Sequence, residues 1–488
     1  MSYLELLKLA APEAIVVVTA LAVLTIGLTT TRALVLGPIV AVLGIAVAIG
    51  AVIMLPAHAN PFGGMLVISP LNSLFKIICL ALAISIVPLI SPEKSLPNPG
   101  EYIAVLLLGS VGLMLLVGSE ELLMIFIGLE LLGLSLYVLT AFDKTDVHSA
   151  EAGLKYFLFG STASAFTLFG ISLIYGMSGT TALAAISQKL TMLQLQPLLA
   201  VGIVMTLIGF AFKIAAAPFH LWAPDAYQGA PIPSAAFIAS GSKVASFVVL
   251  GKIVLIGFGP VHGSADWHAM IAGWSPVLAA LAAFSILLGN FVALAQRNVR
   301  RLLAYSAVAH GGYTLLGIVA GGREGFSATL FYTSIYAVTL IGAFAVVGAV
   351  RRESGGDNLQ NFSGLAARSP FLAACMSIFF LSLAGLPPLA GFFGKFYLFS
   401  AAFRAGGNHG LLWLVAVALF GSFVSLYYYL IVLKVIFVEK SAPSEAGHLS
   451  LVTRHFAANA MIALLAAVVL FLGIMPQTLA AKIIASLP

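Results

Sequence analysis

Charged side chains are scarce in this sequence. Of its 488 residues, 8% are Asp, Glu, Lys or Arg and 61% are hydrophobic. Soluble domains carry roughly 25% charged residues, so the composition excludes an ordinary soluble protein and predicts a polytopic membrane protein. The net charge of +6 does not indicate nucleic-acid binding, because membrane proteins gather Lys and Arg in their cytoplasmic loops.

Cysteine is nearly absent. Cys79 and Cys375 lie alone in apolar stretches and offer neither a disulfide framework nor a metal-binding spacing. The sequence also lacks a GxGxxG fingerprint, a P-loop and a CxxC pair. No loop is long enough for a soluble domain, and we recognise no removable signal peptide. We therefore expect no nucleotide, flavin, iron–sulfur or metal site in this chain.

Long hydrophobic runs, by contrast, fill most of the chain. Runs of about 17 residues or more predict membrane-spanning helices. The fourteen candidates are approximately 12–30, 34–56, 70–90, 101–118, 121–140, 152–176, 197–222, 231–257, 269–295, 301–321, 326–350, 368–402, 411–438 and 456–476. The expected fold is an all-α polytopic membrane protein. Pro218 in the seventh span and Pro387-Pro388 in the twelfth predict that these two helices are broken.

Basic residues outside the spans predict the orientation. The side of the termini would carry five, namely Lys8, Lys189, Arg323, Arg404 and Lys482. The other side would carry eleven, namely Arg32, Lys94, Lys144, Arg297, Arg300, Arg301, Arg351, Arg352, Arg368, Lys440 and Arg454. Since Lys and Arg are enriched in cytoplasmic loops, both termini are expected on the periplasmic side.

Seven lysines lie inside predicted spans, and no arginine does: Lys76, Lys155, Lys213, Lys243, Lys252, Lys395 and Lys434. A lysine at the centre of a membrane helix costs roughly 2.5–3.5 kcal/mol on insertion scales. Lysine, unlike arginine, can change its protonation state in proteins. The set therefore indicates a protein that moves protons. Three of them, Lys76, Lys252 and Lys434, lie near span ends, where snorkelling to the interface is the favoured interpretation.

Two of the lysines lie next to the predicted helix breaks. Pro218 frees a backbone carbonyl one residue from Lys213, and Pro388 frees the carbonyl of Ala384 shortly before Lys395. Freed carbonyls can hold water or an ammonium group, as in the broken helices of transporters. Two breaks five spans apart also indicate an internal repeat with the functional site at the break.

Five further side chains are candidates for a proton relay. Lys243 lies mid-bilayer beside small residues, and Glu130 is the one acid deep inside a predicted span. His310 is mid-helix and titrates near neutral pH in its usual form, although it can equally be a satisfied core histidine. Lys155 is either an accessory relay residue or snorkels. His220 lies on an access path or merely lines the break.

Three motifs resemble those of antiporter-like subunits of respiratory NADH:quinone oxidoreductase (complex I). The segment from Lys213, KIAAAPFHLWAPDAYQGAP, is the first, and its APDAYQGAP portion most resembles the N-type subunit. GLPP before Lys395 and RLLAYS before His310 are the others, and the likeness spans roughly residues 101–440. The M-type relative has glutamate at the position of Lys395, and the L-type relative is longer, so the N type fits best.

The resemblance implies a division of the chain into four segments. These are an N-terminal three-helix segment (1–100), two inverted five-helix repeats that each form a proton half-channel (101–257 and 258–438), and a C-terminal helix (439–488). It also implies an ion pair between Glu130 and Lys213, a central Lys243 and a terminal Lys395. Hydrated polar residues such as His310 would join them.

The same resemblance implies that this chain is a non-redox subunit of a proton-translocating enzyme. FMN, iron–sulfur clusters and quinone are expected in other subunits. The expected partners are another antiporter-like subunit, small membrane subunits and the lipid bilayer, but no nucleic acid. A bacterial cytoplasmic membrane is the favoured location, with a plastid or cyanobacterial version as the alternative.

Three other functions stay open at this point. The first is a subunit of a multisubunit cation/proton antiporter, which shares the lysine motifs, and the second is a membrane subunit of a related hydrogenase complex. The third is a non-conducting membrane scaffold, in which the buried lysines would tolerate neutral substitution.

Overall fold

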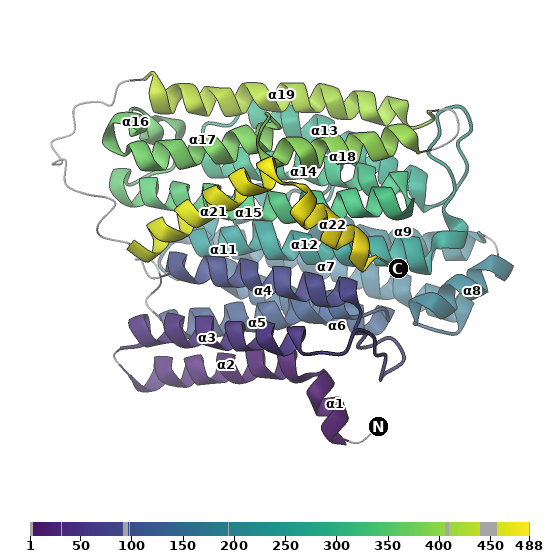
Figure 1. Cartoon of the computed structure of the whole chain (residues 1–488). Coiled ribbons are helices and arrows are strands. Elements are labelled where there is room, and N and C mark those ends of the chain that lie inside the picture. The colour runs from purple at the N-terminus through teal and green to yellow at the C-terminus, as the bar shows by residue number, and fades with distance from the viewer. Residues whose placement is uncertain are drawn as a thin grey trace.

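The computed structural model describes residues 3–30, 32–90, 96, 98–193, 195–405, 409–439 and 456–487. Within these ranges the regular elements are helices, and extended pairing is limited to isolated bridges (Figure 1). Among the described residues, twelve helices are long and apolar enough to cross a membrane, and two shorter apolar helices lie in the two spans predicted to be broken. The expectation of an all-helical, multi-pass membrane protein is confirmed.

The long helices overlap the predicted spans, and several short helices lie between them. The first part of the chain forms α1 (Tyr3–Leu9), α2 (Ala11–Thr29), α3 (Ala33–Ile53), α4 (Pro70–Ile90), α5 (Pro99–Gly118), α6 (Leu122–Thr140), α7 (Val147–Ser178) and α8 (Leu183–Leu193). The middle forms α9 (Pro197–Lys213), α10 (Trp222–Gly229), α11 (Ile232–Phe237), α12 (Lys243–Lys252), α13 (Trp274–Leu294), α14 (Val299–Ala320) and α15 (Gly322–Ser354). The last part forms α16 (Leu365–Arg368), α17 (Pro370–Ala384), α18 (Ala390–Arg404), α19 (Leu412–Phe437), α21 (Phe456–Ile474) and α22 (Gln477–Ser486).

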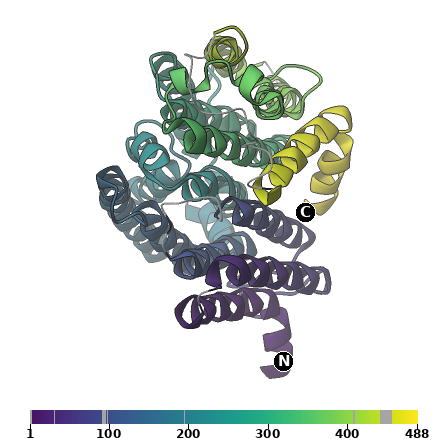
Figure 2. The same cartoon turned by 90° about the vertical axis from the view of Figure 1, so that its left-hand side faces the viewer.

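The long helices lie side by side, and their order in space largely follows the chain from α2 at one edge to α19 at the other (Figures 1 and 2). Helix α15 is almost wholly buried and contacts α14, α17, α18 and α21. Helix α21 returns from the C-terminal end of the chain to pack on α15 and α4. By contrast, α2 and α3 expose many large apolar side chains, which suits a face towards lipid.

Specific side chains and backbone conformations define the helix ends. The carboxylate of Glu121 accepts hydrogen bonds from the backbone N–H groups of Leu123 and Met124 and so caps α6. Asn298 caps α14 in the same way. Gly385 adopts φ 86° after α17, a left-handed conformation that a residue with a Cβ rarely adopts.

Both predicted breaks are present. Helix α9 ends at Lys213 and α10 begins only at Trp222, while α17 ends at Ala384 and α18 begins at Ala390. Each connection contains a cis X–Pro bond, at Pro218 and Pro388 respectively. The eighth span differs from a regular helix in a way that the sequence pattern did not indicate, because π-helical turns at Ile238–Ser242 and Ile253–Gly257 flank α12.

The two chain ends lie at the same end of the helix bundle. Leu9 packs on the loop residues Leu66 and Ile68, and this loop shares a cavity wall with Ala485–Leu487. Three of the basic residues counted for the orientation, Lys94, Lys440 and Arg454, lie outside the described residues, as do residues 440–455 of the predicted C-terminal segment.

Candidate proton-relay site

The first break leaves a lysine without a polar partner. Lys213 is the last residue of α9 and is buried, and its Nζ has no hydrogen-bond partner among the described residues. The ammonium group lies 5.5 Å from the centroid of the Tyr137 ring. It also packs on Gly133, where an added Cβ would come within 2.8 Å of Nζ. A buried ammonium group without a polar partner is energetically costly.

Glu130 does not form the expected ion pair with Lys213. The half-buried carboxylate of Glu130 instead accepts a 2.5 Å hydrogen bond from the hydroxyl of Ser164 on α7. Glu130 is still near enough to act on Lys213 electrostatically. The expected ion pair required the two groups to lie in the same region of the molecule. Nothing in the sequence indicated that a serine on another helix would bind the carboxylate instead.

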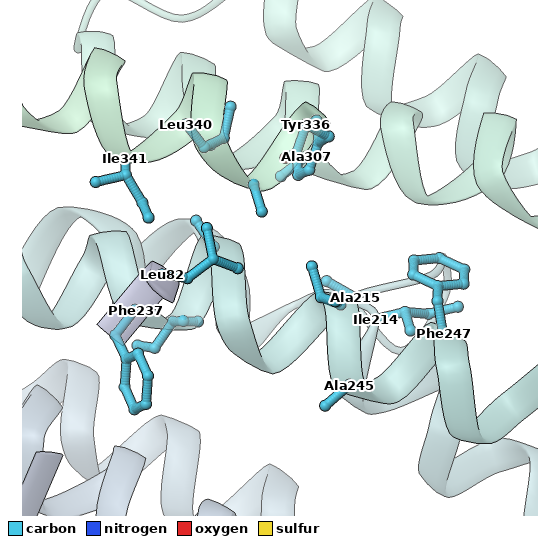
Figure 3. Close-up of a cluster of buried hydrophobic side chains, with 14 of the residues drawn as sticks. Leu82, Ile214, Ala215, Phe237, Ala245, Phe247, Ala307, Tyr336, Leu340 and Ile341 are labelled. Carbon is cyan, nitrogen blue, oxygen red and sulfur yellow. The ribbon is translucent and has the colours of Figure 1, made fainter. Parts of the chain in front are cut away.

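Apolar packing surrounds the first break. Ile214 and Ala215 belong to a cluster of buried hydrophobic side chains that also contains Ala245 and Phe247 (Figure 3). One backbone group of the break has a side-chain partner: the N–H of Ala217 donates to Ser285 Oγ at 2.9 Å. Bulk water is therefore kept from this segment of the chain, which raises the cost of any unpaired charge there.

Lys243 lies at the start of α12, directly after a π-helical turn. Its Nζ donates a 2.6 Å hydrogen bond to the carbonyl oxygen of Ala307 on α14 and lies 5.5 Å from the centroid of the Tyr336 ring. The hydroxyl of Tyr336 is buried and has no partner among the described side chains and backbone. Ala307 precedes His310 by three residues, and residues three apart lie on the same face of a helix. Lys243 therefore contacts the face of α14 that carries His310.

His310 is the centre of an aromatic cluster. Nδ1 is 2.5 Å from the hydroxyl of Tyr332, and Nε2 is 3.1 Å from that of Tyr429. Tyr429 in turn shares a hydrogen bond with Ser306. The expected relay histidine is thus connected on both ring nitrogens. Sequence analysis missed the tyrosines, because an aromatic residue in an apolar helix looks like ordinary core.

Lys395 contacts a backbone carbonyl at the second break, as the sequence predicted. Its Nζ donates to the freed carbonyl of Ala384 and to the hydroxyl of Ser422, both at 3.0 Å. The ammonium group also lies 5.1 Å from the centroid of the Tyr313 ring. Gly385 leaves room for this side chain, since a Cβ there would meet Lys395 Cδ at 2.9 Å.

Lys155 belongs to a different group of charges. Its side chain is 40% exposed, and Nζ lies 2.6 Å from Glu151 and 2.8 Å from Asp225. Arg301 donates to the other oxygen of Asp225 at 2.6 Å. Burial raises the pKa of Asp225, but the hydrogen bonds from Lys155 and Arg301 outweigh it and lower the pKa below its ordinary value. These contacts tie α10 to α7 and α14.

His220 lies within the first break and is buried. Its Nδ1 has no hydrogen-bond partner in the described part of the chain, and its ring is 6.2 Å from that of Tyr305. The structure thus places His220 beside α14 without connecting it to Lys213 or His310 by a hydrogen bond. Its role in the relay stays a prediction.

The interpretation that Lys76 and Lys252 snorkel is wrong. Both are almost completely buried, and Lys76 pairs with Glu13 at 2.6 Å. Lys252 donates to Asn72 and to the backbone of Val117. Distance from a span end did not predict exposure, because residues far apart in the chain cover both lysines. Lys434 is exposed, which agrees with the prediction.

Comparison with known proteins shows the family of this chain. The family model described as "NADH:quinone oxidoreductase/Mrp antiporter, TM" matches residues 119–425. The chain is 45% identical to "NADH-quinone oxidoreductase subunit N 2" of Acidobacterium capsulatum, over 98% of each chain. The chain belongs to the N-type antiporter-like membrane subunits of NADH:quinone oxidoreductase. The N-type assignment made from the APDAYQGAP segment is thereby confirmed.

Solved structures show the same fold for this N-type subunit. A chain of respiratory complex I from Thermus thermophilus has a TM-score of 0.78 and 31% identity, over 96% of this chain and 98% of that one. A chain of the Mrp complex from Dietzia has a TM-score of 0.83 at 21% identity, over 98% and 97% of the two chains. The second likeness shows a shared fold alone.

No group of three or more potential metal-binding His, Cys, Asp or Glu side chains occurs among the described residues.

Proposed function

We propose that this N-type subunit moves protons through a row of buried groups while other subunits of its complex carry out NADH oxidation and quinone reduction. The row comprises Glu130, Lys213, Lys243, His310 and Lys395. One observation carries the proposal: three buried lysines on α9, α12 and α18 each lie at a helix break or against a backbone carbonyl, with His310 on α14 among them.

The contacts favour a switch at the first break. When Glu130 turns from Ser164 towards Lys213, the new ion pair stabilises the ammonium form of Lys213. When Glu130 returns to Ser164, the unpaired ammonium loses that support and gives up its proton. The proton then passes towards Lys243, which donates to the carbonyl of Ala307, three residues before His310 on α14.

The second half of the row suits onward transfer. His310 has hydroxyl partners on both ring nitrogens, so it can accept a proton on one side and release it on the other. The ring of Tyr313 lies beside both His310 and Lys395. Lys395 receives the proton at the second break, where the carbonyl of Ala384 and the hydroxyl of Ser422 hold its ammonium form. We assign Lys155 a positioning role, through its ion pair with Asp225. We assign His220 to the path by which protons reach the row.

The subunit is proposed to lie in a bacterial cytoplasmic membrane with both termini on the periplasmic side. Its partners would be another antiporter-like subunit and small membrane subunits, since the similar chains belong to complex I and Mrp complexes. The fold shared with the Mrp complex keeps cation/proton exchange as the second candidate. Sodium-dependent proton movement without NADH or quinone would favour that candidate.

The proposal is tested with Lys213→Ala and Lys395→Ala in the host complex, reconstituted in closed vesicles. We expect the complex to assemble, while NADH-driven proton uptake falls about tenfold or more, as loss of an acid–base group does in general. Quinone reductase activity coupled to it should fall as well. The matched control is Lys434→Ala, which removes an exposed lysine of α19 and should pump normally.

Full proton uptake in assembled Lys213→Ala and Lys395→Ala complexes would contradict the proposal. It would favour the non-conducting scaffold, in which neutral replacements of these lysines leave translocation unchanged.

A further inference from the structure

A second group of buried ionisable side chains lies at the end of the bundle that carries both chain ends. Lys76 of α4 and Lys252 of the eighth span are 1% and 0% exposed. Each has a carboxylate partner: Lys76 Nζ is 2.6 Å from Glu13 Oε1, and Lys252 Nζ is 3.7 Å from Glu120 Oε1. The relay described above uses none of these four residues.

Both ammonium groups converge on the C-terminal end of α5. Lys252 donates to the carbonyl of Val117 at 2.7 Å, and a Cβ at Gly118 would lie 3.0 Å from Lys76 Nζ. Carbonyls at a helix C-terminus lack helical partners and form the negative end of the helix dipole, so they stabilise cations. Lys76 and Lys252 repel each other electrostatically. Two like charges at one helix end are stable there only while the carboxylates of Glu13 and Glu120 lie close to them.

Asn72 completes the coordination of Lys252. Its side-chain oxygen accepts from Lys252 Nζ at 2.5 Å, and its side-chain nitrogen donates to the carbonyl of Val67 at 2.8 Å. Because the amide nitrogen is engaged, the oxygen is directed at the lysine. Loss of the Glu120 charge would therefore leave Lys252 with two neutral acceptors in place.

A cavity connects Lys252 and Glu120 of this group with the surface. Its volume is about 940 Å³, and its wall includes Lys252, Glu120, His58 and Arg323. Such a volume is large enough to hold many water molecules. The side chain of Glu120 is 30% exposed, whereas that of Lys252 is fully buried. Exposure therefore decreases stepwise from the cavity to the lysine.

The other charged groups that face the cavity do not replace Glu120. Arg323 is directed at the end of the chain, since it donates to the carbonyls of Ile484 and Leu487. His58 lies on the wall without a salt bridge among the described residues. Among the groups on this wall, Glu120 is the one carboxylate next to Lys252.

We propose that Glu120, Lys252, Lys76 and Glu13 form a proton-exchange site that opens through this cavity to water on the side of the chain ends. The proposal rests on the proposed function, since exchange here serves proton translocation. Lys252 passes a proton from its ammonium group to the carboxylate of Glu120, which leaves a neutral amine and a neutral carboxylic acid. Water in the cavity then takes the proton from Glu120, and the reverse steps recharge the pair.

Internal transfer within an ion pair suits a buried site, because it leaves no uncompensated charge. When Lys252 is neutral, its repulsion on Lys76 disappears, and the pair of Lys76 with Glu13 becomes the more stable one. The protonation of Lys252 is thus coupled to the ion pair that joins α4 to α2 at this end of the molecule.

The test uses the assembled complex with Glu120→Gln, which keeps the shape of the side chain and the two neutral partners of Lys252. We expect NADH-driven proton translocation to fall several-fold and its dependence on the pH of the compartment at the chain ends to change. The amount of complex should stay normal. Glu324→Gln is the control, because Glu324 is an exposed glutamate at the start of α15, and Lys252→Met is a second variant.

Each outcome decides between a transport role and a structural one. Normal translocation and a normal pH profile per assembled complex in Glu120→Gln would overturn the exchange site, even where the amount of complex falls. Lys213→Ala in the same vesicles separates the two proposals. Loss in Lys213→Ala with normal pumping in Glu120→Gln overturns the exchange site alone, and the opposite pattern overturns the central relay alone.

Discussion

Ser164 donates a 2.5 Å hydrogen bond to Oε1 of Glu130, while Lys213 Nζ has no hydrogen-bond partner among the described residues. The bond joins α7 to α6 next to the first helix break. It defines one position of the proposed switch, in which the lysine is buried without a partner.

Removal of the serine hydroxyl should release Glu130. In Ser164→Ala we expect the carboxylate to move to Lys213 and form the ion pair, because an unpaired buried ammonium group attracts it. A structure of the variant complex measures the separation of the two groups directly. Ser164→Thr retains a hydroxyl and should leave Glu130 where it is. An unmoved carboxylate in Ser164→Ala would argue against the switch.

A methyl group at Gly133 should disturb Lys213 without disturbing the fold. The added Cβ would lie 2.8 Å from Nζ, at the far end of a flexible side chain that can move aside. We expect Gly133→Ala to assemble but to translocate protons several-fold more slowly. Gly50→Ala is the control, since a Cβ there meets no atom within 4 Å. Equal proton uptake by the two variants would mean that the position of the ammonium group does not matter.

Tyr332→Phe should weaken the connection through His310. The change removes the hydroxyl that bonds Nδ1 and retains the ring that packs against the histidine. Proton translocation should fall several-fold, because the histidine loses one of its two hydroxyl partners. Tyr427→Phe, at an exposed position of α19, should have no effect. An equally small change in proton translocation in both variants would mean that the Tyr332 hydroxyl takes no part in proton transfer.

Asp225→Asn should lower stability by about 1 kcal/mol, since the ion pairs that it removes are partly exposed. The pKa of Asp225 is lowered in the folded protein, so the contribution of its carboxylate is complete above the ordinary pKa of aspartate. It is lost as the pH falls through the lowered value. At neutral pH the purified variant complex should therefore be inactivated at a lower temperature than wild type. This difference in temperature should shrink in strong acid.

The sequence predicted the breaks and the lysines beside them for a clear physical reason. Proline removes a backbone donor wherever it occurs in a helix, so Pro218 and Pro388 locate freed carbonyls without knowledge of the neighbours. Lys395 then binds the carbonyl of Ala384, as expected. A local rule was sufficient because the cause was local.

Contacts between distant segments could not be predicted in this way. Lys252 donates a hydrogen bond to Asn72, which is 180 residues away, and Glu130 accepts one from Ser164, which is 34 residues away. Hydrophobic periodicity gives the length of a span but not which polar side chain of a neighbouring helix it meets. The hydroxyl partners of His310 were missed for the same reason.

The most direct test concerns Lys243, the middle group of the proposed row. Lys243→Met retains the length of the side chain but removes the ammonium group that binds Ala307. The measurement is the rate of NADH-driven proton translocation per assembled complex in closed vesicles. The account predicts a fall of about tenfold or more, as for loss of an acid–base group in general. Translocation at the wild-type rate would contradict it.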